Sequence, residues 1–251
     1  MKHFLFCAGL LLTACGHVDQ NKVFPGTFEG QAVVVWVGSG ATSGYGDGTF
    51  IYVPIPGAEL RFIRDTKAQP SPGSEVITPE AFYTDGGSVP RGVQGLPGFN
   101  AWAYGPAYVI HDWAFVARKC LNDEGRVPAD LITDEMRNIR NMTFAESAYL
   151  MAETIETLVL NHEGDEVSQR VVPSFTAGAV THALWKKKGV CEDQHLKPEH
   201  IEIVEQIQAE RSVVTPEAVI VGGPRSALPG VSPDSPAPLP YTVISVITPG
   251  G

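Results

Sequence analysis

Residues 107–117 read Ala-Tyr-Val-Ile-His-Asp-Trp-Ala-Phe-Val-Ala, and this almost wholly apolar run decides the fold class. Pro106 stands just before the run and suits the first turn of a helix, so we expect a buried helix here. The segments before this helix have strand patterns, and the segments after it have helix patterns. That order favours an α+β fold over one in which strands and helices alternate.

Three short runs rich in β-branched and aromatic residues precede the helix, at 31–37 (QAVVVWV), 49–53 (TFIYV) and 59–63 (ELRFI). They predict the strands of a small antiparallel sheet. The glycine-rich segment 38–48 between the first two runs is typical of a hairpin connection. A phosphate-binding loop fits it poorly, because no Gly-Lys-Ser or Gly-Lys-Thr follows and no helix pattern comes next.

Helix patterns continue after the apolar run, so we expect a cluster of four to five helices in total. The further segments are 129–142, the segment from Thr143 towards His162, the segment from Ser174 to Lys188, and 198–211. Thr143 and Glu146 have the spacing of a capping box, which marks the start of a helix. Beyond Arg211 the chain is rich in Pro, Gly and Ser, a composition that predicts a disordered tail.

The first residues have the order of a signal peptide: a positive charge at Lys2, an apolar run, and small residues before Cys15. The sequence Leu12-Thr13-Ala14-Cys15 resembles the lipobox of bacterial lipoproteins, in which the cysteine carries lipid and begins the mature chain. An ordinary secretory signal with a chance cysteine is the alternative. Gly16 stands where Asp would resemble an inner-membrane retention signal. The sequence therefore favours the outer membrane, facing the periplasm, if the host is Gram-negative.

These features divide the chain into a signal peptide (1–14), a lipidated tether (15–27), a single α+β domain (28–211) and a Pro/Gly-rich tail (212–251). The formal net charge is −10. Nucleic acid is a poor partner for so acidic a chain, because its phosphates require a basic face. Anionic lipid also repels it, so we expect the lipid on Cys15 to be the link to the membrane.

Two cysteines, Cys120 and Cys191, remain after the signal is removed and Cys15 is lipidated. An exported protein meets an oxidising compartment, which favours a disulfide between them. Two free buried thiols are the alternative that the sequence leaves open.

Two segments carry candidate functional residues. In the first, a strand pattern leads into Asp85-Gly86-Gly87-Ser88, where Asp85 and Ser88 suit hydrogen bonds to the local backbone of a turn. In the second, His111 and Asp112 place an imidazole and a carboxylate within the apolar helix. Ionisable groups are costly to bury unless they are paired or liganded, although each of the two could also brace a neighbouring element.

The stretch ITPEAFYTDGGSVP at 77–90, followed by AYVIHDW at 107–113, resembles a phage-associated family known as domain of unknown function 1353. The resemblance covers roughly residues 45–189, and Ala129-Asp130 matches a further element of the family. Ala81 departs from the pattern, which has Gly before the Phe. The family has no settled activity, so the resemblance implies only that Asp85, Ser88, His111 and Asp112 come together in space.

Two carboxylates and a histidine suit Zn²⁺ or another divalent ion, which would turn a bound water into a nucleophile. The leading hypothesis is therefore a metal-assisted hydrolase of envelope material, with Asp85, His111 and Asp112 as ligands or bases. Ser88 would be a hydrogen-bond donor to them. A Ser-His-Asp triad is disfavoured, because Ser88 does not lie in a nucleophile elbow. The rival is a non-enzymatic envelope or phage-derived interaction protein in which the same residues form a structural network.

Overall fold

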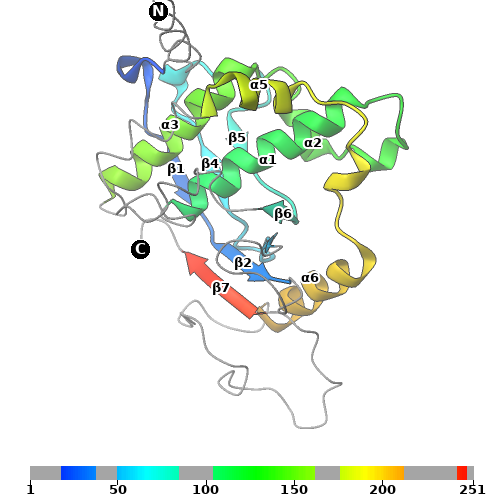
Figure 1. Ribbon diagram of the computed structural model, residues 1–251. Coiled ribbons are helices and arrows are strands. Elements are labelled where there is room, and N and C mark those ends of the chain that lie inside the picture. Colours follow the sequence, from blue (N-terminus) through cyan, green and yellow to red (C-terminus); the bar gives the residue numbers. More distant parts are fainter. Residues whose placement is uncertain (1–17, 38–49, 85–103, 162–175, 212–241, 248–251) are drawn as a thin grey trace, which may run out of the picture.

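Two small antiparallel sheets and five α-helices make up the described part of the chain, which confirms the predicted α+β class (Figure 1). The computed structural model describes residues 18–37, 50–84, 104–161, 176–211 and 242–247. The strands form two sheets and not the single one expected. None of the helices in these ranges combines the length and the apolar composition that crossing a bilayer requires.

The larger sheet has the strand order β6-β3-β2-β7, with all neighbours antiparallel. Its members are β6 (Phe82–Thr84), β3 (Phe50–Val53), β2 (Ala32–Trp36) and β7 (Thr242–Ile247). The pairing of β2 with β3 confirms the predicted hairpin, although the connection itself lies outside the described residues.

The smaller sheet has the order β1-β4-β5 and is also antiparallel. Its members are β1 (Thr27–Glu29), β4 (Arg61–Ile63) and β5 (Val76–Ile77). The third predicted strand, at 59–63, therefore belongs to this sheet and not to the sheet that holds the other two.

Strand β2 is buried on both faces, which explains its unbroken apolar sequence. Ala32 and Val34 face the main core, which contains α1 (Gly105–Asn122). Val33 and Val35 face a second cluster that includes apolar side chains of α6 (Pro198–Arg211). A short continuous apolar run is what a strand covered on both sides requires.

Helix α1 lies at the centre of the molecule, and the side chains from Ala107 to Ala117 are buried apart from half-buried Asp112. It contacts β2, β6 and the helices α2 (Asp134–Asn138), α3 (Phe144–Leu160) and α5 (Ala179–Trp185). Pro106 occupies the first turn, as the sequence predicts. The buried helix at 107–117 is thus confirmed.

The prediction of one continuous helix over residues 129–142 is wrong. A 3₁₀ turn, η3 (Ala129–Leu131), comes first, and α2 is a separate short helix. Thr133 separates them because its hydroxyl accepts a hydrogen bond from the Met136 amide at 3.2 Å and so caps a new helix. The cap predicted at Thr143 is confirmed by the 3.1 Å hydrogen bond from the Glu146 amide.

The helix predicted up to Lys188 is α5, which ends at Trp185. Its first residue follows Gly178, while Ser174, the predicted cap, lies outside the described residues.

Two predicted boundaries need correction. The tail at 212–251 is not disordered throughout, because residues 242–247 form β7 beside β2. This segment (TVISVI) is rich in β-branched residues, unlike the Pro-rich part before it, and it pairs with an otherwise open edge. The tether also ends earlier than predicted. Val18 is buried against Ala148 and Ala152 of α3, and the Gly26 amide donates to the Thr157 hydroxyl at 2.9 Å.

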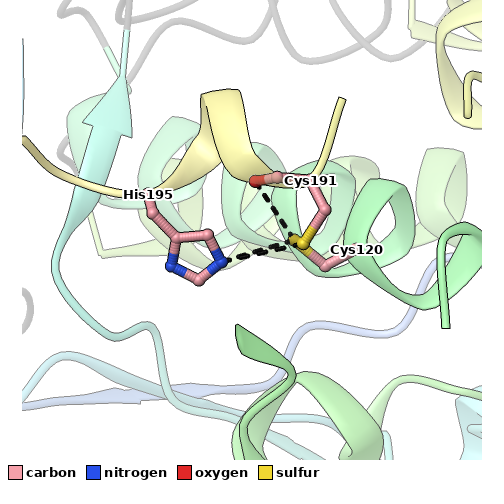
Figure 2. A group of neighbouring side chains, drawn as sticks. All are labelled: Cys120, Cys191 and His195. Carbon is pink, nitrogen blue, oxygen red and sulfur yellow. Dashed lines mark hydrogen bonds between the residues drawn. A yellow bond between two sulfur atoms is a disulfide. The ribbon is translucent and has the colours of Figure 1, made fainter. Parts of the chain in front are cut away.

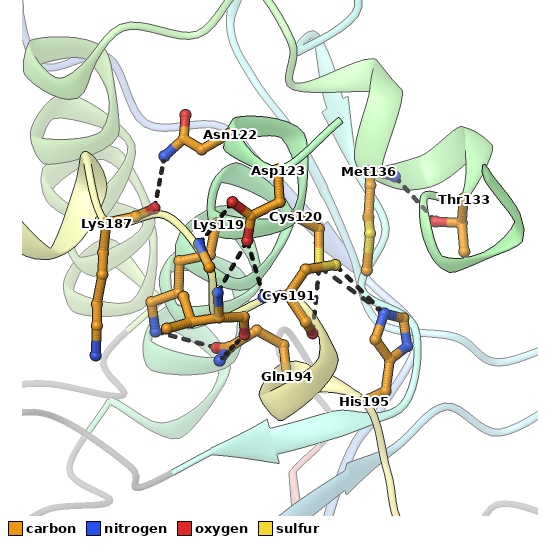
Figure 3. Close-up of a disulfide and its surroundings, with 12 residues drawn as sticks. Lys119, Cys120, Asn122, Asp123, Thr133, Met136, Lys187, Cys191, Gln194 and His195 are labelled. Atoms are coloured by element: carbon orange, nitrogen blue, oxygen red, sulfur yellow. Dashed lines mark hydrogen bonds between the residues drawn. A yellow bond between two sulfur atoms is a disulfide. The ribbon is translucent and has the colours of Figure 1, made fainter. Parts of the chain in front are cut away.

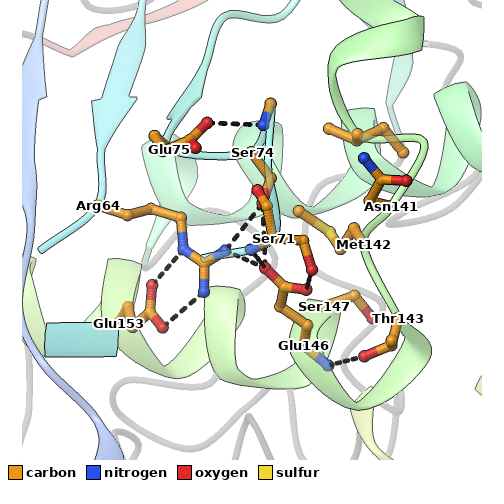
Figure 4. A network of polar contacts seen from close by, with 12 residues as sticks. Arg64, Ser71, Ser74, Glu75, Asn141, Met142, Thr143, Glu146, Ser147 and Glu153 are labelled. Atoms are coloured by element: carbon orange, nitrogen blue, oxygen red, sulfur yellow. Dashed lines mark hydrogen bonds and ion pairs between the residues drawn. The ribbon is translucent and has the colours of Figure 1, made fainter. Parts of the chain in front are cut away.

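A buried ionic network joins β4 to α3 (Figure 4). Arg64, directly after β4, binds both carboxylate oxygens of Glu153, at 2.8 and 2.9 Å, and Glu146 at 2.6 Å. Ser71 and Ser74 donate further hydrogen bonds to Glu146. One guanidinium thus faces two largely buried carboxylates, and the serine hydroxyls help to compensate the second negative charge. The network fixes the small sheet against the helical layer.

Candidate functional site

The end of β6 meets α1 at the candidate site. Thr84, the last residue of β6, donates a hydrogen bond from its hydroxyl to the Asp112 carboxylate at 2.8 Å. Both elements are fixed by packing, since β6 pairs with β3 and α1 crosses the main core. Thr84 is buried, whereas the Asp112 side chain remains 19% exposed. A carboxylate that is partly exposed therefore lies against the strand that leads into Asp85.

His111 lies beside this carboxylate and is almost sealed from solvent, at 5% exposure. Its Nδ1 is 4.0 Å from Asp112 Oδ1, and its ring packs on Phe115 with centroids 4.9 Å apart. Nε2 is buried and has no hydrogen-bond partner among the described residues. Burial lowers the pKa of His111 from 6.5 to about 4, so the imidazole is neutral at pH 7.

Tyr108 stands one helical turn before Asp112, on the same stripe of α1. Its hydroxyl is buried without a hydrogen-bond partner in the part of the chain that the structure describes, and its ring meets Tyr104 edge-on at 6.3 Å. Burial raises the pKa of Tyr108, and the nearby Tyr104 and the Asp112 carboxylate raise it further. The phenol is thus protonated at neutral pH. Two buried polar atoms without partners, Nε2 of His111 and the hydroxyl of Tyr108, lie on this stripe.

The predicted site residues are therefore placed only in part. His111 and Asp112 are neighbours at the β6–α1 junction, while Asp85, Ser88 and Cys15 lie outside the described residues. The sequence reasoning missed Thr84 and Tyr108. A signal for Tyr108 was present, because residues four apart on a helix share a face. No sequence pattern pointed to Thr84, because the helix residue that a strand residue contacts depends on the tertiary packing.

The predicted pairing of Cys120 with Cys191 is confirmed: the two form a disulfide with their Cα atoms 4.4 Å apart (Figure 2). Nε2 of His195 lies 3.8 Å from Cys120 Sγ and 3.7 Å from Cys191 Sγ. Within the described ranges, no other group of three His, Cys, Asp or Glu side chains has ligand atoms this close together. Because the sulfurs are bonded to each other, they offer no thiolates to a metal.

A carboxylate clamp holds the segment that carries Cys191 (Figure 3). Asp123, just after α1, accepts hydrogen bonds from the amides of Gly189, Val190 and Cys191 at 2.6, 2.9 and 3.1 Å. These hydrogen bonds, that of Gly189 first, lower the pKa of Asp123. The disulfide and the clamp together attach the end of α1 to the segment between α5 and α6, far from the β6–α1 junction along the helix.

The native protein is expected to lose stability in acid because of His111, and a His111→Gln variant is expected not to show this loss. Below pH 6.5 the unfolded chain protonates His111 and the folded chain does not, so the free energy of unfolding falls as the pH drops towards 4. The full loss is about 3 kcal/mol. Denaturant unfolding at pH 7, 5.5 and 4.5, with EDTA present to exclude metal, measures it. Parallel pH profiles for the two proteins would contradict a buried neutral His111.

Comparison with protein-family models, curated proteins and solved structures finds no match to this chain. The motif resemblance drawn from residues 77–90 and 107–113 therefore stays a prediction, and the functional argument rests on the geometry of the chain itself.

Proposed function

We propose that the protein is a lipoprotein of the cell envelope, anchored through lipid on Cys15, and that the β6–α1 junction is a metal-assisted hydrolytic site. The observation that carries the site is the hydrogen bond from Thr84 to Asp112. It ties the strand that leads directly into Asp85 to the helix turn that holds His111. The contact joins Thr84, the last described residue of the first motif, to Asp112 of the second, and so supports the proposal that the two motifs form one site.

The residues present suit a divalent cation such as Zn²⁺. Nε2 of His111 is a buried polar atom without a partner, and the lowered pKa keeps the imidazole neutral, the form that binds metal. Asp112 supplies a carboxylate whose Oδ2 accepts a hydrogen bond from the Thr84 hydroxyl. Asp85 is the proposed third ligand, and Ser88 a hydrogen-bond donor to the ligands. Such an ion supplies a nucleophilic hydroxide at neutral pH.

Thr84 acts as a positioning residue in this proposal. Its hydroxyl donates to Oδ2 of Asp112 and so fixes the orientation of the carboxylate, whose Oδ1 lies 4.0 Å from Nδ1 of His111. Partners that orient a metal ligand in this way usually contribute to the affinity for the metal.

The rival is a structural network in an envelope or phage-derived interaction protein without catalytic activity. The burial of His111 and Thr84 favours it, because a catalytic cluster must open to its substrate. The partial exposure of Asp112 favours the hydrolase. Metal content separates the two.

The test uses the full-length lipidated protein, purified in detergent, and measures metal by elemental mass spectrometry. We expect about one divalent ion per chain, and its loss in Asp85→Asn, His111→Gln and Asp112→Asn. Thr84→Val keeps the shape but removes the hydroxyl, and it is expected to weaken metal affinity roughly tenfold or more. Release of soluble fragments from purified cell walls should fall in step with the metal.

Asp134→Asn is the matched control, since its side chain is almost fully exposed on α2. It should retain the metal and the activity. A native protein without metal, or ligand variants that keep it, would sink the hydrolase and leave the structural network. The mass of the mature N-terminus tests the lipid on Cys15 separately.

A further inference from the structure

Helix α5 presents an entirely apolar outer face. Ala179, Val180, Ala183 and Leu184 are exposed, with Val180 at 78% and Leu184 at 44%. The inner face is held by Trp185, which is buried against Phe115 and Phe144. The positions i, i+1, i+4 and i+5 form one stripe on a helix. A short helix thus directs its apolar stripe outwards, away from the core.

Three exposed lysines, Lys186, Lys187 and Lys188, follow the helix directly. The backbone of this segment is fixed, because the Asn122 amide donates to the carbonyl oxygens of Trp185 and Lys187. An apolar stripe next to a cluster of cations, in a chain of net charge −10, is a local reversal of the overall charge. We call these seven residues the α5 surface.

The start of the described chain lies beside the α5 surface. Val18 packs in one cluster with Ala148 and Ala152 of α3, and Ala177, two residues before α5, packs against that cluster. Val18 is three positions after Cys15 in the sequence, a reach of about 10 Å. Figure 1 shows η1 (Gln20–Lys22) and α5 at one end of the molecule, and α6 with β7 at the other.

We propose that the α5 surface rests on the lipid bilayer to which Cys15 is attached, an inference that depends on the proposed lipid anchor. Val180 and Leu184 enter the boundary between headgroups and acyl chains, and the three lysines bind anionic headgroups. The short link to Cys15 keeps the α5 surface close to the bilayer. The lipid therefore holds the domain near the membrane, and α5 sets its orientation there. The end that carries α6 and β7 then points away from the membrane.

The test is quenching of an added tryptophan by brominated acyl chains. The full-length lipidated variants Val180→Trp and Ile201→Trp are reconstituted in phosphatidylethanolamine–phosphatidylglycerol vesicles, with and without bromine, and compared with the native protein. Ile201 on α6 is also an exposed apolar side chain, at 43%, and lies at the opposite end of the molecule. The tryptophan at 180 should lose roughly half its emission, since an interfacial helix buries its apolar face about 5–10 Å deep. The tryptophan at 201 should be unchanged.

Replacing all three lysines with glutamine in the Val180→Trp protein should reduce the quenching, as should phosphatidylcholine vesicles, which lack anionic headgroups. Equal quenching at 180 and 201, with lipid on Cys15 confirmed by mass, would overturn the orientation and leave the anchor intact. A mature protein without lipid would overturn both, because the proposed orientation depends on the anchor to hold the α5 surface near the bilayer.

Discussion

An Arg64→Leu variant is expected to lose about 3–5 kcal/mol of the free energy of unfolding. The substitution leaves the carboxylates of Glu153 and Glu146, which are 1% and 13% exposed, without their cation. Water cannot take its place, so the folded state must bear an uncompensated buried charge or protonate it. Denaturant unfolding at pH 7, monitored by circular dichroism, measures the loss.

Arg61→Leu is the matched control for this prediction. Arg61 is the first residue of β4, three positions before Arg64, and pairs with Glu29 at 3.4 Å, but both side chains are about half exposed. Exposed pairs contribute about 0–1 kcal/mol, so little change is expected. Replacing Glu153 with Leu as well as Arg64 should recover part of the loss, because the more deeply buried of the two unpaired carboxylates is then removed. Equal effects at positions 61 and 64 would show that the buried network contributes no more than the exposed pair.

Where a segment's own pattern sets its structure, the fold could be predicted from the sequence. The apolar run 107–117 gave the central helix, and the capping box at Thr143 gave the start of α3. Tertiary contacts decided the rest. Residues 242–247 form a strand only because β2 offers an open edge, and residues 18–27 lie on the domain because Val18 fits between alanines of α3.

The candidate site was predictable in its residue types but not in its geometry. His111 and Asp112 stand out because ionisable groups are rare in an apolar run. Thr84 does not, since a threonine that ends a strand is common. The Arg64 network was missed for the same reason: its partners are separated by 82 and 89 residues, and no local pattern links them.

Removing the disulfide is the other change with a large expected effect. A Cys120→Ala/Cys191→Ala protein should lose about 4 kcal/mol of unfolding free energy, because the bond closes a loop of 71 residues and so restricts the unfolded chain. The melting temperature should fall by roughly 10 °C for a domain of this size. Treatment of the native protein with a reducing agent should lower it similarly, to the extent that the buried sulfurs react.

The Asp123 clamp attaches the same segment to α1 as the disulfide does, so the two contributions can be compared. Asp123 holds Gly189, Val190 and Cys191 by their amides, so it fixes the same segment in the folded state without restricting the unfolded chain. Asp123→Asn in the native protein should therefore cost less than the loss of the disulfide. The loss of unfolding free energy caused by Asp123→Asn should be larger in the protein without the disulfide than in the native protein. The clamp is then the main attachment of this segment to α1. An unchanged melting temperature after both cysteines are replaced would show that the clamp alone suffices and that the covalent bond adds nothing to the stability of the fold.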